Sequence, residues 1–278
     1  MCYVKCPARS LRTAVSTCTH RIKWRGNTHL RVVNQALELL KKANVPAAKR
    51  AVQVLTASNC RKAWETGLWE VDNSNLADSP GKAMGAHFYN VRHIDGRGSK
   101  TKSTTYLIAG IDQTKHGNAA SNAKARLAKA GNLSTAAKCR QFGNALHYVT
   151  DITQPIHSSS FSGISVPTQL HPVWEDYVPT VQANFKATGW NKHWTQSDRG
   201  AMVDAASVHA NEAMAGLMKS VKYKGTICTA TPQSGITYTG DCFFNVPAAN
   251  AAIGRILVLA YQSTARYILA VFKSAPKK

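Results

Sequence analysis

Apolar residues recur at intervals of three and four along most of the chain, and this spacing limits its fold more than any other feature. In the segment THLRVVNQALELLKKANVP, for example, Leu30, Val33, Leu37 and Leu40 share one face, and Pro46 ends the pattern. Alternating apolar and polar residues, typical of strands, are confined to TYTGDCFFNV and STTYLIAGI. We therefore expect an all-α fold, a single multi-helix domain. The further helices are expected over 47–70, 121–130, about 135–150, 173–185, 197–221 and 246–272.

The charge balance is strongly basic. The 278 residues include 35 Lys and Arg against 14 Asp and Glu, a formal net charge of +21. This excess is compatible with a well-solvated surface, and it also favours attraction to polyanions such as nucleic acid, anionic lipid or a polyanionic wall. The most apolar segment, 251–272, is interrupted by Arg255 and Arg266, so a membrane span is not expected.

The cysteines and the first residues bear on processing. The seven cysteines include no CxxC pair, which argues against a thiolate metal site. Cys228 and Cys242 flank a polar, hairpin-like segment, where a local disulfide is expected if the protein is exported.

Residues 1–23 carry five Lys or Arg and lack the apolar stretch of a standard secretory signal. We expect 1–23 to be a basic leader or propeptide-like segment and 24–278 to be the folded domain.

Two pairs of metal-binding side chains stand close together in the sequence. In ALHYVTDITQPIHSSSF, His147 and Asp151 are four residues apart, so a helix places them on one face, and His157 follows a turn. His171 and Glu175 repeat this spacing in HPVWEDY. One such pair is more often a surface ion pair. Two pairs with a third histidine between them form the nitrogen and oxygen ligand set that zinc favours.

Three residues upstream are further candidates. His29 lies at a helix start, Asp72 at the end of an apolar helix, and His87 between small and aromatic residues. Each has a structural alternative: a capping turn for His29, a helix-terminal acid for Asp72 and a half-buried core histidine for His87.

Taken in order, these segments resemble a known family. NTHLRVVNQAL, ETGLWEVD, AHFYN, FGNALHYVTDITQPIHSSSF and LHPVWEDY resemble the zinc-dependent phospholipases C, the trizinc α-helical enzymes of bacteria. The resemblance covers about Trp24 to Tyr177, and its most specific part is H-x3-D-x5-H-x13-H-x3-E. It identifies 24–278 as the expected catalytic domain and implies three zinc ions.

The resemblance also implies a role for each candidate. Asp72 is expected as a further ligand or as the base that acts on water. The first two zinc ions are expected to be held by His87, His147 and Asp151, and by His157, His171 and Glu175.

The third zinc is implied to be held by His29, by Asp151 as a bridging carboxylate, and by the α-amino nitrogen and carbonyl oxygen of an N-terminal tryptophan. Trp24 is the matching residue, but it follows Lys23 in this sequence. Its amine exists only after cleavage between them, so N-terminal sequencing of active protein is expected to begin at Trp24. The alternative is that Trp24 is a packing aromatic.

The family implies hydrolysis of glycerophospholipids to diacylglycerol and a phosphorylated head group, at a phospholipid membrane surface, by a secreted monomer. Asn73 and Met84 stand where aromatic residues of a choline-binding cage are expected. Together with the positive charge, this favours an anionic or broadly accepted phosphoester over phosphatidylcholine.

Two other functions are compatible with the sequence. The spacing from Trp24 to His29 and the basic charge also match the related zinc-dependent single-strand nucleases and 3′-nucleotidases, for which nucleic acid is the partner. The third possibility is a zinc-stabilised binding protein without catalysis, in which loss of Asp72 is neutral.

Overall fold

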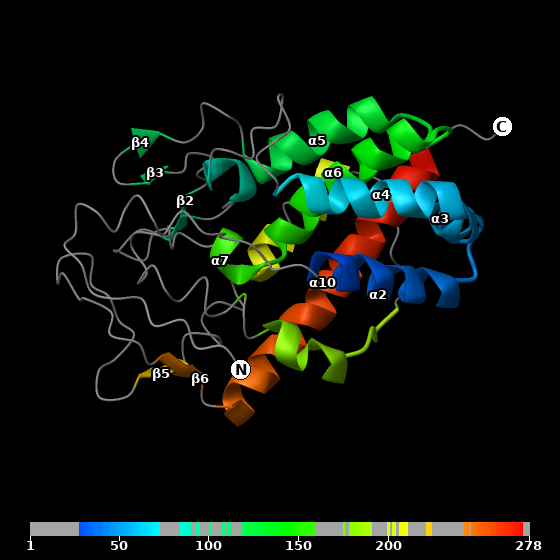
Figure 1. Cartoon of the computed structure of the whole chain (residues 1–278). Coiled ribbons are helices and arrows are strands. Elements are labelled where there is room, and N and C mark those ends of the chain that lie inside the picture. Colours follow the sequence, from blue (N-terminus) through cyan, green and yellow to red (C-terminus); the bar gives the residue numbers. More distant parts are fainter. Residues whose placement is uncertain are drawn as a thin grey trace.

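Figure 1 shows a computed structural model of the chain, which is built mainly of α-helices. Structural statements concern the residues that it describes: 28–72, 84–89, 93–94, 100–101, 107–108, 111–112, 118–158, 175, 178–190, 199–200, 202–203, 206–210, 221–223, 242–244 and 246–274.

The first and last described helices pack together. Helix α2 (Thr28–Lys42) has the predicted apolar face, and Val32, Val33 and Leu40 on it are buried. The long helix α10 (Val246–Ser274) passes behind α2 in Figure 1 and also contacts α3 (Pro46–Thr56). None of the described helices is both long enough and apolar enough to cross a bilayer.

Helices α4 (Ser58–Glu70) and α6 (Ala136–Ile152) lie side by side and run in the same direction. Three contacts fix this arrangement, and each joins residues 79 apart in sequence: a disulfide joins Cys60 to Cys139, Gly143 lies against the backbone of Trp64, and His147 contacts the carbonyl of Leu68. The contacts succeed one another along both helices. The pair therefore has one fixed register from the disulfide to the polar residues at its far end.

Hydrogen bonds reinforce the α4–α6 contact. The Asn144 amide donates to the Gly67 carbonyl at 2.7 Å and to Glu70 Oε1 at 2.9 Å, and the Arg140 guanidinium pairs with Glu70. A side chain at Gly67 would overlap the Arg140 backbone. Both contact glycines are thus required by the close approach of the two backbones.

Helix α5 (Ala119–Ala130) packs on α6 and begins two residues before the predicted start. Asn118 caps it: the Asn118 side chain accepts from the Ser121 N–H, and the Ser121 hydroxyl receives the Asn118 N–H. For α6, Thr135 provides the N-cap by accepting from the Lys138 N–H. The predicted helix of about 135–150 is therefore confirmed, with its last turn extended.

The helix predicted over 47–70 is wrong as one element, because the chain breaks at Ala57, which is extended with ψ 130°. The indole N–H of Trp64 donates to the Leu55 carbonyl at 2.8 Å. This bond satisfies a carbonyl at the end of α3 and lets α4 start in a new direction.

Short antiparallel strand pairs complete the described elements. Strands β3 and β6 fall in the two predicted segments, whereas β1 and β2 lie in a segment predicted to be a loop, which is a correction. Each strand has two or three residues, so the all-α class stands. The bounds are β1 His93–Ile94, β2 Lys100–Thr101, β3 Leu107–Ile108, β4 Ile111–Asp112, β5 Val221–Tyr223 and β6 Cys242–Phe244.

The disulfide between Cys60 and Cys139 was not predicted from the sequence. Its cysteines are 79 residues apart and become neighbours only through the packing of α4 on α6. Cys228 lies outside the described residues, so its pairing with Cys242 stays a prediction.

The contact between Gly143 and Trp64 generates a stability prediction. A Cβ at Gly143 would overlap the Trp64 carbonyl, so Gly143→Ala should destabilise the protein by about 1–3 kcal/mol in spite of alanine's better helix propensity. Thermal unfolding should show a lower Tm. Gly254→Ala on α10 is the comparison variant, since its Cβ would meet the side-chain ring of Phe185 instead of a backbone carbonyl and should cost less. A raised Tm for Gly143→Ala would contradict the close backbone contact.

Candidate metal centre

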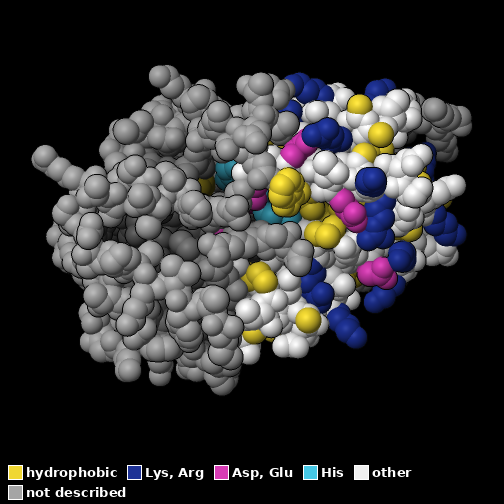
Figure 2. All heavy atoms as spheres, viewed as in Figure 1, with side chains coloured by type: hydrophobic (Ala, Val, Ile, Leu, Met, Phe, Trp, Pro, Cys, Tyr) yellow, Lys and Arg dark blue, Asp and Glu magenta, His cyan; other side chains and the backbone are white. Residues whose placement is uncertain are grey.

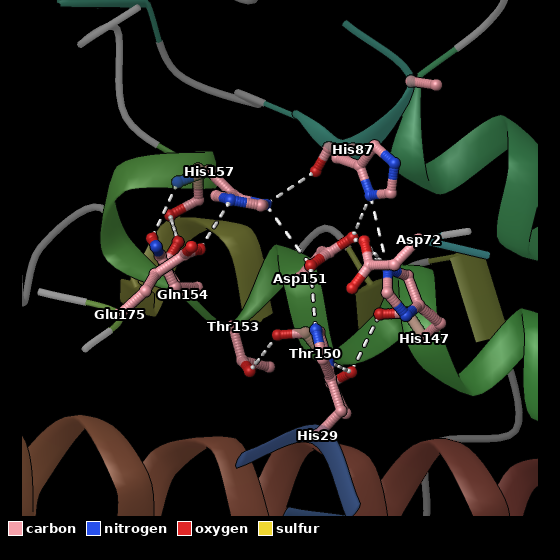
Figure 3. A network of polar contacts seen from close by, with 12 residues as sticks. His29, Asp72, His87, His147, Thr150, Asp151, Thr153, Gln154, His157 and Glu175 are labelled. Atoms are coloured by element: carbon pink, nitrogen blue, oxygen red, sulfur yellow. Dashed lines mark hydrogen bonds and ion pairs between the residues drawn. The ribbon is translucent and has the colours of Figure 1, made fainter. Parts of the chain in front are cut away.

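The candidate site is built around one buried carboxylate, that of Asp151 in the last turn of α6. Figure 3 shows four imidazole rings directed at it. Its Oδ2 lies 2.8 Å from His87 Nδ1 and 3.2 Å from His147 Nε2, and its Oδ1 lies 3.4 Å from His157 Nδ1 and 3.6 Å from His29 Nε2. Residues distant in sequence are thus brought to one carboxylate.

Apart from His147, which lies within α6, these side chains come from a helix end or the turn beside it. His29 is the second residue of α2, and Asp72 follows the end of α4. His87 ends the short 3₁₀ helix η2 (Met84–His87), and His157 lies in α7 (Pro155–Ser158), which the predicted turn at TQP introduces. Such ends are where polar side chains can leave the helical packing and face a common space.

A backbone carbonyl orients His147. Its Nδ1 donates to the Leu68 carbonyl at 2.8 Å, because a carbonyl oxygen only accepts. Nε2 is therefore the atom directed at the site, 3.6 Å from Asp72 Oδ1 and 3.2 Å from Asp151 Oδ2. Orientation of one ring nitrogen by a carbonyl is the usual support for a metal-binding histidine.

His157 is held in the same manner. Its Nδ1 donates to the His87 carbonyl at 3.1 Å, and its backbone N–H donates to Gln154 Oε1 at 2.9 Å. Its Nε2 then faces Glu175 Oε1 at 3.7 Å. These are two of the three ligands predicted for the second zinc, and the remaining one, His171, lies outside the described residues, as does Trp24.

Two groups of ligand atoms are close enough to share one ion. His87, His147 and Asp151 form one group, and His29, Asp72 and His147 form the other; within each group the atoms lie within 4.8 Å of one another. The first group consists of the three residues predicted to hold the first zinc. In the second group His29 lies beside Asp72 and His147. His29 is also near Asp151, which belongs to the first group. Imidazole nitrogens and carboxylate oxygens at these separations fit the donor preferences of zinc.

The site reaches the surface at its edge. The side chains of Asp72 and His87 are 14% and 12% exposed, whereas that of Asp151 is 2% exposed. In Figure 2, histidine and acidic side-chain atoms are visible on this face, and Lys and Arg are spread over the helical half of the molecule. Asp72 is therefore the carboxylate with better access to water.

Burial and mutual attraction shift the ionisation of the central pair. Burial by itself lowers the pKa of His147, but the carboxylates of Asp151 and Asp72 outweigh it and raise that pKa to about 9. Burial by itself raises the pKa of Asp151, but His147, His157 and His87 hold it well below its usual range. The pair is therefore an imidazolium beside a carboxylate when no metal is bound.

The pKa values of two further groups, Glu175 and His29, are shifted so that the neutral form is favoured. Burial raises the pKa of Glu175 to about 7, with partial opposition from His157. Burial, with the neighbouring His147, lowers the pKa of His29 well below its usual value. A neutral imidazole is the form that binds a metal ion.

Sequence reasoning overlooked polar residues that support the site, among them Gln154, described above, and Thr150. Thr150 is fully buried and its Oγ1 lies 2.6 Å from His29 Nδ1. A signal was present in the sequence: Thr150 is a hydroxyl residue directly before Asp151, on a helix whose neighbouring positions are apolar or ligand residues.

Comparisons with known proteins give consistent results. The chain is 25% identical over 197 residues to a phospholipase C of Bacillus cereus, and this match covers 69% of this chain and 64% of the relative. It is 28% identical over 181 residues to a phospholipase C of Listeria monocytogenes, and this match covers 62% of this chain and 58% of the relative. The predicted resemblance to the phospholipase C family is confirmed. The chain spans less than two thirds of the length of these phospholipase C relatives.

Solved structures give the same fold. The alpha-toxin of Clostridium absonum matches with a TM-score of 0.59 and 16% identity, over 91% of this chain and 65% of that chain. A Clostridium perfringens alpha-toxin from an avian strain matches with a TM-score of 0.58 and 15% identity, over 91% of this chain and 64% of that chain. These structures confirm the all-α fold class. No protein-family model matches the chain.

The pKa shifts generate a pH prediction for metal-free protein. Because His147 and Glu175 have folded-state pKa values of about 9 and about 7, above their unfolded values, the stability that each contributes is present at low pH. It is lost as the pH rises, first through the pKa of Glu175 and then through that of His147. A metal ion must displace the His147 proton, so metal affinity should rise over the same range.

The gap in Tm between zinc-loaded and chelator-treated protein should therefore widen between about pH 6.5 and pH 9. Thermal unfolding at constant ionic strength measures this gap. A gap that stays constant or narrows over this range would contradict the assigned ionisation.

Proposed function

We propose that this chain is a zinc-dependent phosphodiester hydrolase, a phospholipase C that cleaves glycerophospholipids to diacylglycerol and a phosphorylated head group. The observation that carries the proposal is the convergence of four imidazoles on the buried carboxylate of Asp151, with Asp72 and Glu175 beside them. The ligands proposed for the ions are those of the two described groups, together with His157, Glu175 and the predicted Trp24 and His171.

When bound, zinc ions at this site would screen the charge of the phosphate, acidify the attacking water and neutralise the leaving oxygen. The protein's own contribution is to hold the ligands in place. The Leu68 carbonyl fixes His147 and the His87 carbonyl fixes His157. Asp151 lies between these two rings, with Oδ2 near His147 and Oδ1 near His157.

Asp72 is the proposed proton acceptor. It lies at the water-accessible edge of the site, with Oδ1 3.6 Å from His147 Nε2, so its carboxylate could accept a proton from a water molecule bound beside His147. Asp151, which is almost fully buried and has a lowered pKa, is better suited to bind a cation than to take up a proton.

The proposed partner is a phospholipid membrane surface. The relatives reported above are named phospholipase C, and the charge of +21 favours an anionic surface. We further propose three zinc ions, a secreted protein and a monomer. The disulfide between Cys60 and Cys139 supports export, since disulfides persist in oxidising compartments.

Hydrolysis should depend on bound zinc. Elemental analysis of the purified protein should find zinc, and the protein should release phosphorylated head groups from vesicles of phosphatidylglycerol or phosphatidylinositol faster than from phosphatidylcholine. Chelation should abolish release and added zinc should restore it. Full activity of metal-free protein would refute the proposal.

Removal of the Asp72 carboxylate tests its role. Asp72→Asn should reduce hydrolysis by about 10²- to 10⁴-fold, as expected for loss of a general base. Zinc content measured on the same samples separates a base, for which zinc is retained, from a ligand, for which zinc is lost. Glu65→Gln on α4, the helix that precedes Asp72, is the matched control, because Glu65 pairs with Arg61 at the surface. Unchanged hydrolysis by Asp72→Asn would refute the role of Asp72, whereas the non-catalytic alternative requires that the wild-type protein hydrolyses no phosphodiester.

A single-strand nuclease with 3′-nucleotidase activity is the second candidate, and the positive charge is the observation that favours it. Its signature would be salt-sensitive cleavage of single-stranded DNA without release of head groups from vesicles. The same zinc-loaded preparation serves both assays, so the substrate class is decided directly.

A further inference from the structure

His29 has a buried partner that lies outside the ligand set. Its Nδ1 is 2.6 Å from Thr150 Oγ1, and both residues are buried. Thr150 lies on α6 between His147 and Asp151, so one turn of this helix carries both ligands and the residue that contacts a third (Figure 3).

The surroundings of Thr150 determine which atom donates the hydrogen bond between Thr150 and His29. Its hydroxyl lies 2.9 Å from the Leu146 carbonyl and 2.8 Å from the His147 carbonyl, so its hydrogen has two acceptors within the helix. When the hydroxyl donates to either carbonyl, a lone pair on Oγ1 remains to accept a hydrogen bond from His29 Nδ1.

A proton on Nδ1 leaves the other ring nitrogen of His29 with a lone pair. That nitrogen, Nε2, is the atom directed at Asp151 Oδ1, at 3.6 Å. A histidine binds a metal ion through an unprotonated nitrogen, and the hydrogen bond made by the other nitrogen selects the tautomer.

We propose that Thr150 is a positioning residue that holds His29 in the Nδ1–H tautomer and so sets the affinity of the metal ion to which His29 binds. This inference rests on the proposed zinc-dependent function. The role is distinct from that of Leu68 and the His87 carbonyl, because Thr150 acts through a side chain and can be changed by substitution.

Substitution by valine removes the hydroxyl and keeps the branched shape. In Thr150→Val the Nδ1 proton of His29 would be buried without its acceptor, which is unfavourable, so the Nδ1–H tautomer should be depopulated. Thr150→Ser keeps the hydroxyl and should restore the wild-type behaviour. Thr56→Val is the matched control, since Thr56 makes the same kind of bond to a helix carbonyl, that of Val52, at 2.7 Å.

The first readout is the tautomer itself. Long-range ¹H–¹⁵N correlation spectra of zinc-loaded, ¹⁵N-histidine-labelled protein should show His29 as the Nδ1–H tautomer in the wild type and in Thr150→Ser. The His29 signal is assigned by its absence from His29→Gln. In Thr150→Val this signal should shift or disappear, and circular dichroism confirms that the variant is folded.

The second readout is zinc affinity, measured by competition with a chromophoric chelator. The most weakly held zinc should bind about 10- to 100-fold less tightly in Thr150→Val than in Thr150→Ser or Thr56→Val. Equal zinc affinity and an unchanged His29 signal in Thr150→Val would overturn the inference and leave the proposed function intact. Absence of zinc binding by the wild-type protein would overturn both.

Discussion

The structure of the candidate site depends on the burial of the Asp151 carboxylate. A charged carboxylate removed from water is costly unless partners compensate it. Here the partners are imidazole rings of His29, His87, His147 and His157, and they come from four different elements. The ionised carboxylate therefore constrains where α2, η2, α6 and α7 can lie, and it concentrates nitrogen and oxygen ligands in one place.

The register of α4 on α6 positions further residues of the site. Two glycines permit the backbones to touch, and the contact brings the Leu68 carbonyl to His147 and the end of α4, with Asp72, to the site. The apolar side chains of both helices belong to the same core as those of α2 and α10. The packing of α4 on α6 thus sets the positions of His147 and of the chain end that carries Asp72.

Local periodicity was sufficient to predict the all-α class, most helices, and the pairing of His147 with Asp151, because each of these depends on neighbouring residues. The assignments of Asp72, His87 and His29 required the resemblance to a family, since nothing local links them to α6. The break at Ala57 and the disulfide depend on long-range packing that no local pattern encodes. The position of Thr150 beside Asp151 is a local signal, but its contact with His29 also depends on that packing. Trp24 and His171 stay predictions.

The covalent bond between Cys60 and Cys139 lies on the same helix pair as the proposed zinc ligands His147 and Asp151. Dithiothreitol, which is commonly added to protect cysteines during purification, attacks disulfides and also presents soft thiolates for which zinc has high affinity. A single additive would thus act both on the disulfide and on the proposed metal site of one helix pair. Preparations made with and without thiol would accordingly differ in both.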